Sequence, residues 1–376
     1  MSDDLNPPDL APAAASDTSW GAPPAAPEAT VLQGRCSVCG AQLAYAPGTR
    51  LLECGSCGNR VEIARPQDHV VEEHSYAHWV ADHGRYEVAS IGGQVLRCQG
   101  CGASTETKDV AGSCQFCGGA LVSVTNPAGV IVPEGVLPFQ VDGPAARDQF
   151  RSWVRSRWFA PGALKKVGDT ESLQGTYLPH WTFDAETTSD YTGQRGEHYW
   201  VKEGDQQVRK TRWYGARGTV ELSFDDVLVP GSTTLPTDRV EKLGPWSLDA
   251  VEPYQPEYLL GHSAVRYDVD PQAALPQAQA QMDGEIRDEV KRDIGGDEQQ
   301  VHHVNTRYDQ LMFKLILLPI WIATFMYAGR QWQVTINANT GEVVGQRPYS
   351  VPKIMAATIV ALIVVSLLIW YGTSRA

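Results

Sequence analysis

Eight cysteines, arranged as four C-x-x-C pairs, constrain the first third of this chain more than any other feature of its sequence. The two pairs of the first set are separated by 14 residues and those of the second set by 12, which is typical of two knuckles that hold four thiolates around one Zn²⁺. A glycine follows the second cysteine of every pair, where the backbone must turn so that amide groups point at sulfur. The predicted zinc ligands are Cys36, Cys39, Cys54 and Cys57 for one ion and Cys98, Cys101, Cys114 and Cys117 for a second.

Both predicted zinc sites are structural, because four protein thiolates leave no coordination position for water. The N-terminal stretch has no Lys or Arg before Arg35 and no apolar run, so it does not resemble a secretory signal. We therefore expect reduced, metal-bound thiols in a cytoplasm rather than disulfides. Such small modules cannot build a core alone, and bound metal supplies roughly 10–16 kcal/mol of their folding free energy.

The charge of the chain argues against nucleic acid as its partner. The net charge is −13, and residues 36–117 hold six Lys or Arg against nine Asp or Glu, a local net charge of −3. Negative surfaces are repelled by phosphate backbones, and a module that reads DNA should be basic. We expect the predicted ribbons to contact proteins.

The end of the sequence predicts a membrane span. Residues 354–371 carry no charge and would form a helix about 27 Å long, close to the roughly 30 Å of a bilayer core. Trp370 and Tyr371 stand at one boundary and Lys353 at the other. We predict a transmembrane helix over residues 353–371 and a short tail over 372–376. A reducing compartment for the thiols then places the body in the cytoplasm, tail-anchored by a single span.

Residues 125–350 are expected to form a β-rich α+β body. One helix should start after Asp142 and run to about Trp158, and a second should run to Ile294, where Gly295 stops it. Apolar strands are expected at 177–183 and 317–325, and a hairpin at 339–341.

The two helices and their strands resemble each other. "VDGPAARDQF" is echoed by "VDPQAALPQA", and "YLPHWTF" by "LLPIWIATF". These matches would divide the body into repeats over 134–265 and 266–350. They are short and gapped, so duplication and coincidence both stay open.

The remaining segments complete an α+β organisation with two small β zinc ribbons. Residues 1–33 are rich in Ala and Pro and lack the material for a core, so they are expected to be a disordered tail. Residues 34–66 and 95–124 are the two ribbons, and residues 67–94 are a linker expected to be helical.

Six basic residues of the body are candidates for contact with an anionic surface. Arg147, Arg151 and Arg155 lie at i, i+4 and i+8 on the first predicted helix. A second cluster holds Arg209, Lys210 and Arg212. Under a tethered body these charges would meet lipid head groups, each contributing on the order of 1 kcal/mol. The alternative is a solvated face on which they pair with neighbouring acids.

Nothing in the sequence argues for catalysis. The chain has no G-x-x-x-x-G-K-[ST] loop, no G-x-S-x-G and no H-E-x-x-H, and every cysteine belongs to a predicted zinc site. His180 is an isolated group in a predicted strand and is expected to pack at the edge of the core.

The ribbons, the segments "YLPHWTFDAETTSDYTGQRGEHYW" and "LILLPIWIATFMYAGRQWQVTINANTGEVVGQRP", and the closing span together resemble a bacterial family of membrane-anchored proteins with TFIIB-type zinc ribbons. Its members are often labelled "primosomal protein N′ (replication factor Y), superfamily II helicase", a label that the missing P-loop contradicts here. Similar ribbon proteins of Gram-positive bacteria look like membrane partners of phage-shock protein A and of SPFH (flotillin-like) proteins.

This resemblance implies a non-enzymatic adaptor in membrane stress or envelope maintenance. The rival hypothesis is a nucleic-acid-binding membrane protein that uses its ribbons and Arg clusters. A third is a sensor whose body encloses a small ligand.

Overall fold

The computed structural model describes residues 34–64, 71–81, 94–98, 103–107, 114, 116, 121–124, 131–161, 172–327, 330–346 and 349–373. Over these residues the chain is α+β and built mostly of strands, with one apolar helix near the C-terminus. The predicted tail over 1–33, the predicted zinc ligands Cys101 and Cys117, and residues 374–376 lie outside the described residues.

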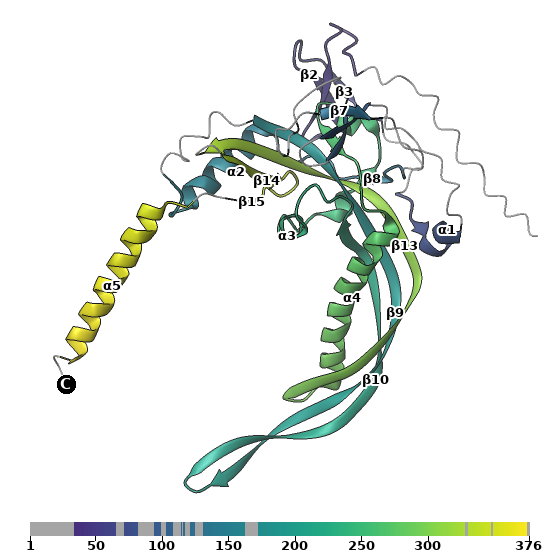
Figure 1. The fold of residues 1–376 in the computed structure, drawn as a ribbon. Coiled ribbons are helices and arrows are strands. Elements are labelled where there is room, and N and C mark those ends of the chain that lie inside the picture. Colours follow the sequence, from purple (N-terminus) through teal and green to yellow (C-terminus); the bar gives the residue numbers. More distant parts are fainter. Residues whose placement is uncertain are drawn as a thin grey trace, which may run out of the picture.

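Three long strands dominate the body. They are β9 (Ser172–Glu203), β10 (Gln206–Pro230) and β13 (Glu298–Tyr327), and β9 pairs antiparallel with both of the others. Strands of 25 to 32 residues are far longer than the typical five or six. Figure 1 shows the three strands curving together, with the β9–β10 hairpin extending beyond the other elements.

Bulges and a helix explain this curvature. The ladder shifts register between Phe224 and Val227 in β10, and twice in β13, and each bulge bends its strand. The helix α4 (Pro271–Ile294) lies along the curved strands. It buries one residue per turn against aromatic side chains of the sheet such as Trp181 and Phe313. The buried residues of α4 include Ala274, Ala278, Met282, Ile286, Val290 and Ile294.

Both predicted helices of the body start where their caps indicate. Asp142 accepts a hydrogen bond of 2.8 Å from the Ala145 amide and begins α2 (Gly143–Ser156). Asp270 accepts one of 2.7 Å from Ala273 and begins α4. α2 ends two residues before the predicted Trp158, and α4 ends at Ile294 as predicted. The predicted apolar strands are the central parts of β9 and β13.

Corresponding residues of the two predicted repeats make corresponding hydrogen bonds, each to the other repeat. The indole of Trp181 donates to the Val269 carbonyl at 2.8 Å, and the indole of Trp321 donates to the Val141 carbonyl at 2.7 Å. Leu178 and Leu318, the matching residues of the two L-P-x-W motifs, are antiparallel partners. Each indole therefore hydrogen-bonds to the residue immediately before the N-cap of the helix in the other predicted repeat.

The small elements complete the sheets. The hairpin predicted around 339–341 is formed by β14 (Arg330–Asn337) and β15 (Val343–Gly345). Further short elements are β8 (Gly135–Val136), α3 (Thr237–Glu241), η2 (Leu248–Ala250), β11 (Glu252–Pro253), η3 (Pro256–Leu259) and β12 (Ser263–Val265). The strands of the first cysteine module are β1 (Leu43–Ala46), β2 (Leu51–Cys54) and β3 (Arg60–Glu62), and the strands near the second cysteine set are β5 (Gln94–Cys98), β6 (Ser104–Thr107) and β7 (Leu121–Val124).

The segment between the two cysteine sets contains one short helix where it is described. It forms β4 (His74–Ser75), which pairs with β13, and one short helix, α1 (Tyr76–Ala81). Trp79 of α1 is buried in the core between α4 and the long strands. The segment is therefore held to the body by a bridge of backbone hydrogen bonds and one anchoring indole.

The last described element is α5 (Val351–Thr373). Within it, Pro352–Tyr371 is long and apolar enough to cross a membrane, and none of this stretch is buried within the chain. Figure 1 shows α5 leaving the body beside α2.

Candidate metal centre

Four thiols of the N-terminal module converge. The Sγ atoms of Cys36 and Cys57 lie 3.5 Å apart, and those of Cys39 and Cys54 lie 3.4 Å apart. All four sulfurs lie within 4.8 Å of one another, and none of these cysteines forms a disulfide. Zn–S bonds of about 2.3 Å in a tetrahedron require S···S edges of about 3.8 Å, so the cluster has the size of a four-thiolate metal site.

The backbone around each pair explains this convergence. Gly40 and Gly58 both adopt φ of +72°, the left-handed conformation expected after the second cysteine. The amide of Cys36 donates to Ala41 at 2.7 Å, and that of Cys54 donates to Asn59 at 2.9 Å. The two knuckles are thus closed by the same backbone hydrogen bond, and β1–β2–β3 holds them face to face.

The electrostatics of the four thiols favour a bound cation. Backbone N–H groups of Cys39 and Val38 lower the pKa of Cys36 to about 6. Those of Cys57 and Ser56 lower the pKa of Cys54. At Cys57 the Asn59 amide acts in the same direction, but the neighbouring thiols together raise the pKa to about 12. Some of the four thiols are therefore easily ionised, but each thiolate makes it harder to ionise its neighbours. Ionising all four requires a compensating dication.

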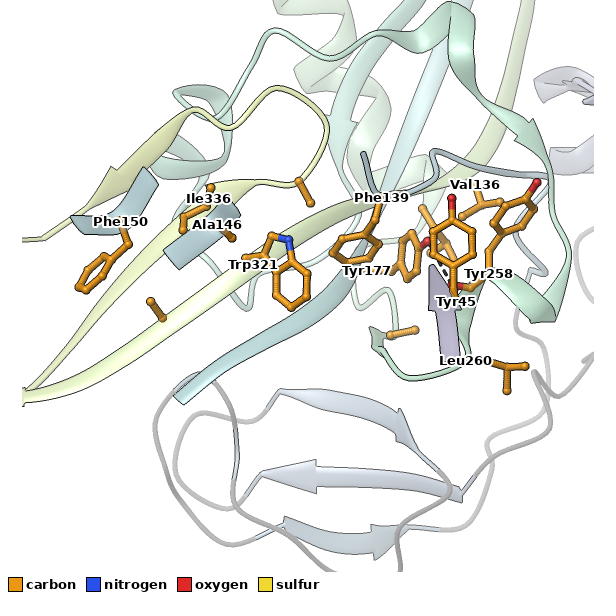
Figure 2. Close-up of a cluster of buried hydrophobic side chains, with 14 of the residues drawn as sticks. Tyr45, Val136, Phe139, Ala146, Phe150, Tyr177, Tyr258, Leu260, Trp321 and Ile336 are labelled. Atoms are coloured by element: carbon orange, nitrogen blue, oxygen red, sulfur yellow. Dashed lines mark hydrogen bonds between the residues drawn. The ribbon is translucent and has the colours of Figure 1, made fainter. Parts of the chain in front are cut away.

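The cysteine module shares its core with the body. Tyr45 of β1 packs against Tyr258 with ring centroids 5.3 Å apart, and its amide donates to the Leu260 carbonyl at 2.8 Å. The Gly48 amide donates to the Phe139 carbonyl at 2.7 Å. Figure 2 shows Tyr45 and Tyr258 in one run of side chains with Tyr177, Phe139 and Trp321. The module is therefore fixed to the body by an aromatic core and by backbone hydrogen bonds.

The second cysteine set is described only in part. Cys98 and Cys114 are buried in one hydrophobic cluster with Phe116. The Cys98 amide donates to the Ala103 carbonyl at 2.8 Å, the same five-residue closure seen at the two knuckles of the first module. β5 pairs with β6 and β7, and β6 joins the body through β12.

A second group of acidic side chains lies on the long strands, where no metal site was predicted. Oxygen atoms of Asp184, Asp225 and Asp226 lie within 4.8 Å of one another, and burial raises the pKa of Asp184 to about 7. The amino group of Lys314 lies 2.7 Å from Asp226 and 2.9 Å from Glu73. Burial lowers the pKa of Lys314, but its hydrogen bonds to the two carboxylates raise it above its usual value. The lysine therefore supplies the cation of this cluster, and we assign it a structural role.

Lys314→Met is expected to lower the free energy of unfolding by about 1–3 kcal/mol, because it leaves the partly buried carboxylates of Asp226 and Glu73 without a counter-charge. The lysine side chain is only 11% exposed. Lys242→Met is the matched control, since its ion pair with Asp238 is exposed and should contribute less than about 1 kcal/mol. Urea unfolding of both variants measures the difference, and equal midpoints would contradict a buried role for Lys314.

The six basic residues predicted to meet an anionic surface fall in two separate places. Arg147 and Arg155 are exposed on α2 and make no hydrogen bond or ion pair with any described residue. Arg151 pairs with Asp148 at 3.3 Å.

The second cluster lies on the β9–β10 hairpin. Lys210 pairs with Glu203 at 2.5 Å, and Arg212 stacks on the ring of Tyr199 at 4.9 Å. Arg209 is exposed on the same strand. Two of these three charges are thus engaged within the hairpin itself.

Two histidines lie in the core, and burial lowers the pKa of each. His180, which was expected at the edge of the core, is only 1% exposed and therefore lies inside it, and burial lowers its pKa to about 4. His262 was not singled out by its sequence context. Its ring stacks on Phe139 with centroids 4.0 Å apart, and burial lowers its pKa to about 4. A single histidine between a glycine and a serine carries no signal of this packing.

Comparisons with known proteins give one informative similarity. The chain is similar to the "Uncharacterized protein YdjG" of Bacillus subtilis (strain 168), with 25% identity over 352 residues that cover 91% of this chain and 99% of YdjG. No protein-family model matches the chain. No solved structure matches it.

Proposed function

We propose that this protein is a non-enzymatic adaptor held at the cytoplasmic membrane by α5, with metal-stabilised cysteine modules that bind protein partners. The observation that carries this proposal is the closed cluster of Cys36, Cys39, Cys54 and Cys57. Four thiolates around one ion leave no position for a substrate or a water molecule, so such a site shapes a surface instead of performing a reaction.

The way the first module joins the body supports the same role. The core around Tyr45 and Phe139 gives the module a fixed orientation. The two knuckle turns remain on the surface, where Val38 is 71% exposed. An apolar side chain presented on a rigid, metal-clamped turn is suited to contact with a protein partner.

Zinc is the metal that we propose, with one ion in each cysteine set. Four soft thiolates in a tetrahedral arrangement favour zinc or iron. Zinc is redox-inactive, which suits a purely structural site. For the second ion, the support is the knuckle closure from Cys98 to Ala103, which repeats the geometry of the first module. Reduced thiols require that the modules face the cytoplasm. α5 would then cross the membrane once.

The resemblance to ribbon proteins of the envelope suggests the partners. We expect a detergent extract of native membranes to yield a phage-shock protein A-like or an SPFH-like protein on the tagged full-length chain. The control is the same extract passed over the tagged variant Val38→Asp, in which a charged side chain replaces the exposed apolar side chain of the first knuckle. Recovery of neither protein on an intact, metal-loaded bait would contradict the adaptor role.

We further propose that the body is an internal duplication, in which the helix of each half packs against the strands of the other half of the same chain. The support is the reciprocal pair of indole hydrogen bonds to Val269 and Val141. Equivalent bonds run from Gly231 to Pro179 at 2.9 Å and from Ala338 to Pro319 at 3.0 Å.

Trp181→Phe and Trp321→Phe should therefore each destabilise the body by a similar amount, about 1–3 kcal/mol, because each removes one partly buried hydrogen bond between the halves. Chemical unfolding of the two variants measures the effect. A large loss in one variant with none in the other would contradict equivalent roles.

A further inference from the structure

An exposed tryptophan lies beside the start of α5. Trp158 follows the last turn of α2, and 78% of its surface is accessible. It is the most exposed large apolar side chain among the described residues, more so than any residue of α5. Leaving an indole in water forfeits the free energy that its burial would provide, whereas the interface of a bilayer favours an aromatic ring with one polar atom.

Hydrogen bonds tie this tryptophan to the first turn of α5. The Ser350 amide donates to the Phe159 carbonyl at 2.8 Å. The amino group of Lys353 donates to the carbonyls of Ala160 at 2.7 Å and of Trp158 at 3.3 Å. Lys353 marks the boundary of the apolar stretch, so residues 158–160 lie at the level where α5 would enter the bilayer. Figure 1 shows α2 next to this end of α5.

The charge next to Trp158 is positive and unsatisfied. Arg155 lies in the last turn of α2, is exposed, and makes no hydrogen bond or ion pair within the described part of the chain. Arg157 stacks on the buried ring of Trp153 at 4.9 Å, which keeps its positive charge at the same end of the helix. The acid nearest in sequence, Asp148, pairs with Arg151 two turns earlier.

We propose that Trp158 and Arg155 form a lipid-binding platform, in which the indole enters the boundary between head groups and acyl chains and the guanidinium binds the phosphate of an anionic phospholipid. This inference rests on the proposed function, because it requires α5 to be the membrane anchor. It assigns α2 the task of fixing the body against the membrane surface. The hairpin cluster at Arg209 does not share this task, since nothing ties it to α5.

The test uses the full-length chain with Trp370→Phe, which removes the tryptophan of α5 itself, in vesicles of phosphatidylcholine alone or mixed equally with phosphatidylglycerol. Lipids brominated near the top of their acyl chains quench only tryptophans that touch them. We expect brominated lipid to quench the fluorescence of one indole and Trp158→Phe to abolish that quenching. We expect brominated phosphatidylglycerol to quench more strongly than brominated phosphatidylcholine.

Arg155→Gln should lower this preference for phosphatidylglycerol about fivefold, the factor that corresponds to one head-group charge. Arg287→Gln, an exposed arginine of α4, is the matched control and should leave the preference unchanged. Quenching that persists in Trp158→Phe, or a preference that Arg155→Gln does not alter, would overturn the platform while the chain stays in the vesicles. Release of the chain by alkaline carbonate would instead overturn the anchor and the platform together.

Discussion

Cys54→Ser is expected to remove one metal ion per chain and to unfold the N-terminal module. The thiol of Cys54 is buried at 1% exposure, and its sulfur lies 3.4 Å from that of Cys39. Metal binding contributes roughly 10–16 kcal/mol to the folding of such modules, and a serine hydroxyl is a poor ligand for a soft site. This loss is comparable to the whole stability of a typical domain, which is about 5–15 kcal/mol.

The consequence should reach the body, because Tyr45 of the module packs against Tyr258. We expect the zinc-to-protein ratio, measured by elemental mass spectrometry, to fall by one and the urea midpoint of the whole chain to fall as well. Ser56→Ala is the matched control, since it changes an exposed side chain of the same knuckle and keeps the amide that faces Cys54. An unchanged ratio in Cys54→Ser would show that the four thiols do not hold one ion.

Ile359→Arg combined with Ile363→Arg is expected to release the chain from membranes. The two side chains lie one turn apart near the middle of α5, and both are exposed. An arginine at the centre of a span costs about 2.5–3.5 kcal/mol on the insertion scale, where each Leu, Ile or Val contributes about −0.3 to −0.6 kcal/mol. Two such changes cancel most or all of the insertion free energy of α5.

Alkaline carbonate extraction measures this outcome as the share of chain in the pellet. The wild type and the double control Ile359→Leu, Ile363→Leu should remain in the pellet, and the double arginine variant should move to the supernatant. Retention of the arginine variant would mean that something other than α5 holds the chain at the membrane.

The elements that the sequence predicted well are those with local causes. Asp142 and Asp270 cap their helices through their own side chains, so the starts of α2 and α4 can be read from a few neighbouring residues. Gly40 and Gly58 adopt the turn that places amides around sulfur, and this too depends only on adjacent residues. The convergence of the first four cysteines follows from the same local geometry.

The features that could not be predicted depend on contacts between distant residues. Tyr45 looks like an ordinary strand residue, and its partner Tyr258 is more than two hundred residues away, so nothing local indicates that the module joins the core of the body. Lys314 interrupts an apolar segment, and only the fold brings Asp226 and Glu73 to its amino group.

The outer parts of β9 and β10, which form the end of their hairpin past Gly196, also escaped prediction. Past Gly196 the residues of the β9–β10 hairpin are exposed or half-buried, and Figure 1 shows no helix over this part of the two strands. The two strands pair nonetheless from Pro230 with His180 to Gln206 with Glu203, interrupted by one bulge between Phe224 and Val227. Backbone hydrogen bonds extend the hairpin where no burial pattern marks it.

X-ray absorption at the zinc edge of the full-length protein, purified with reductant in lipid nanodiscs, tests the metal centre most directly. The four sulfur positions of the first module predict a single shell of four sulfur neighbours at about 2.3 Å around its ion, and the proposed second site should give the same shell. Nitrogen or oxygen neighbours in that shell, or a metal-free protein whose cysteines are joined as disulfides, would contradict the assignment of Cys36, Cys39, Cys54 and Cys57 as a closed structural site.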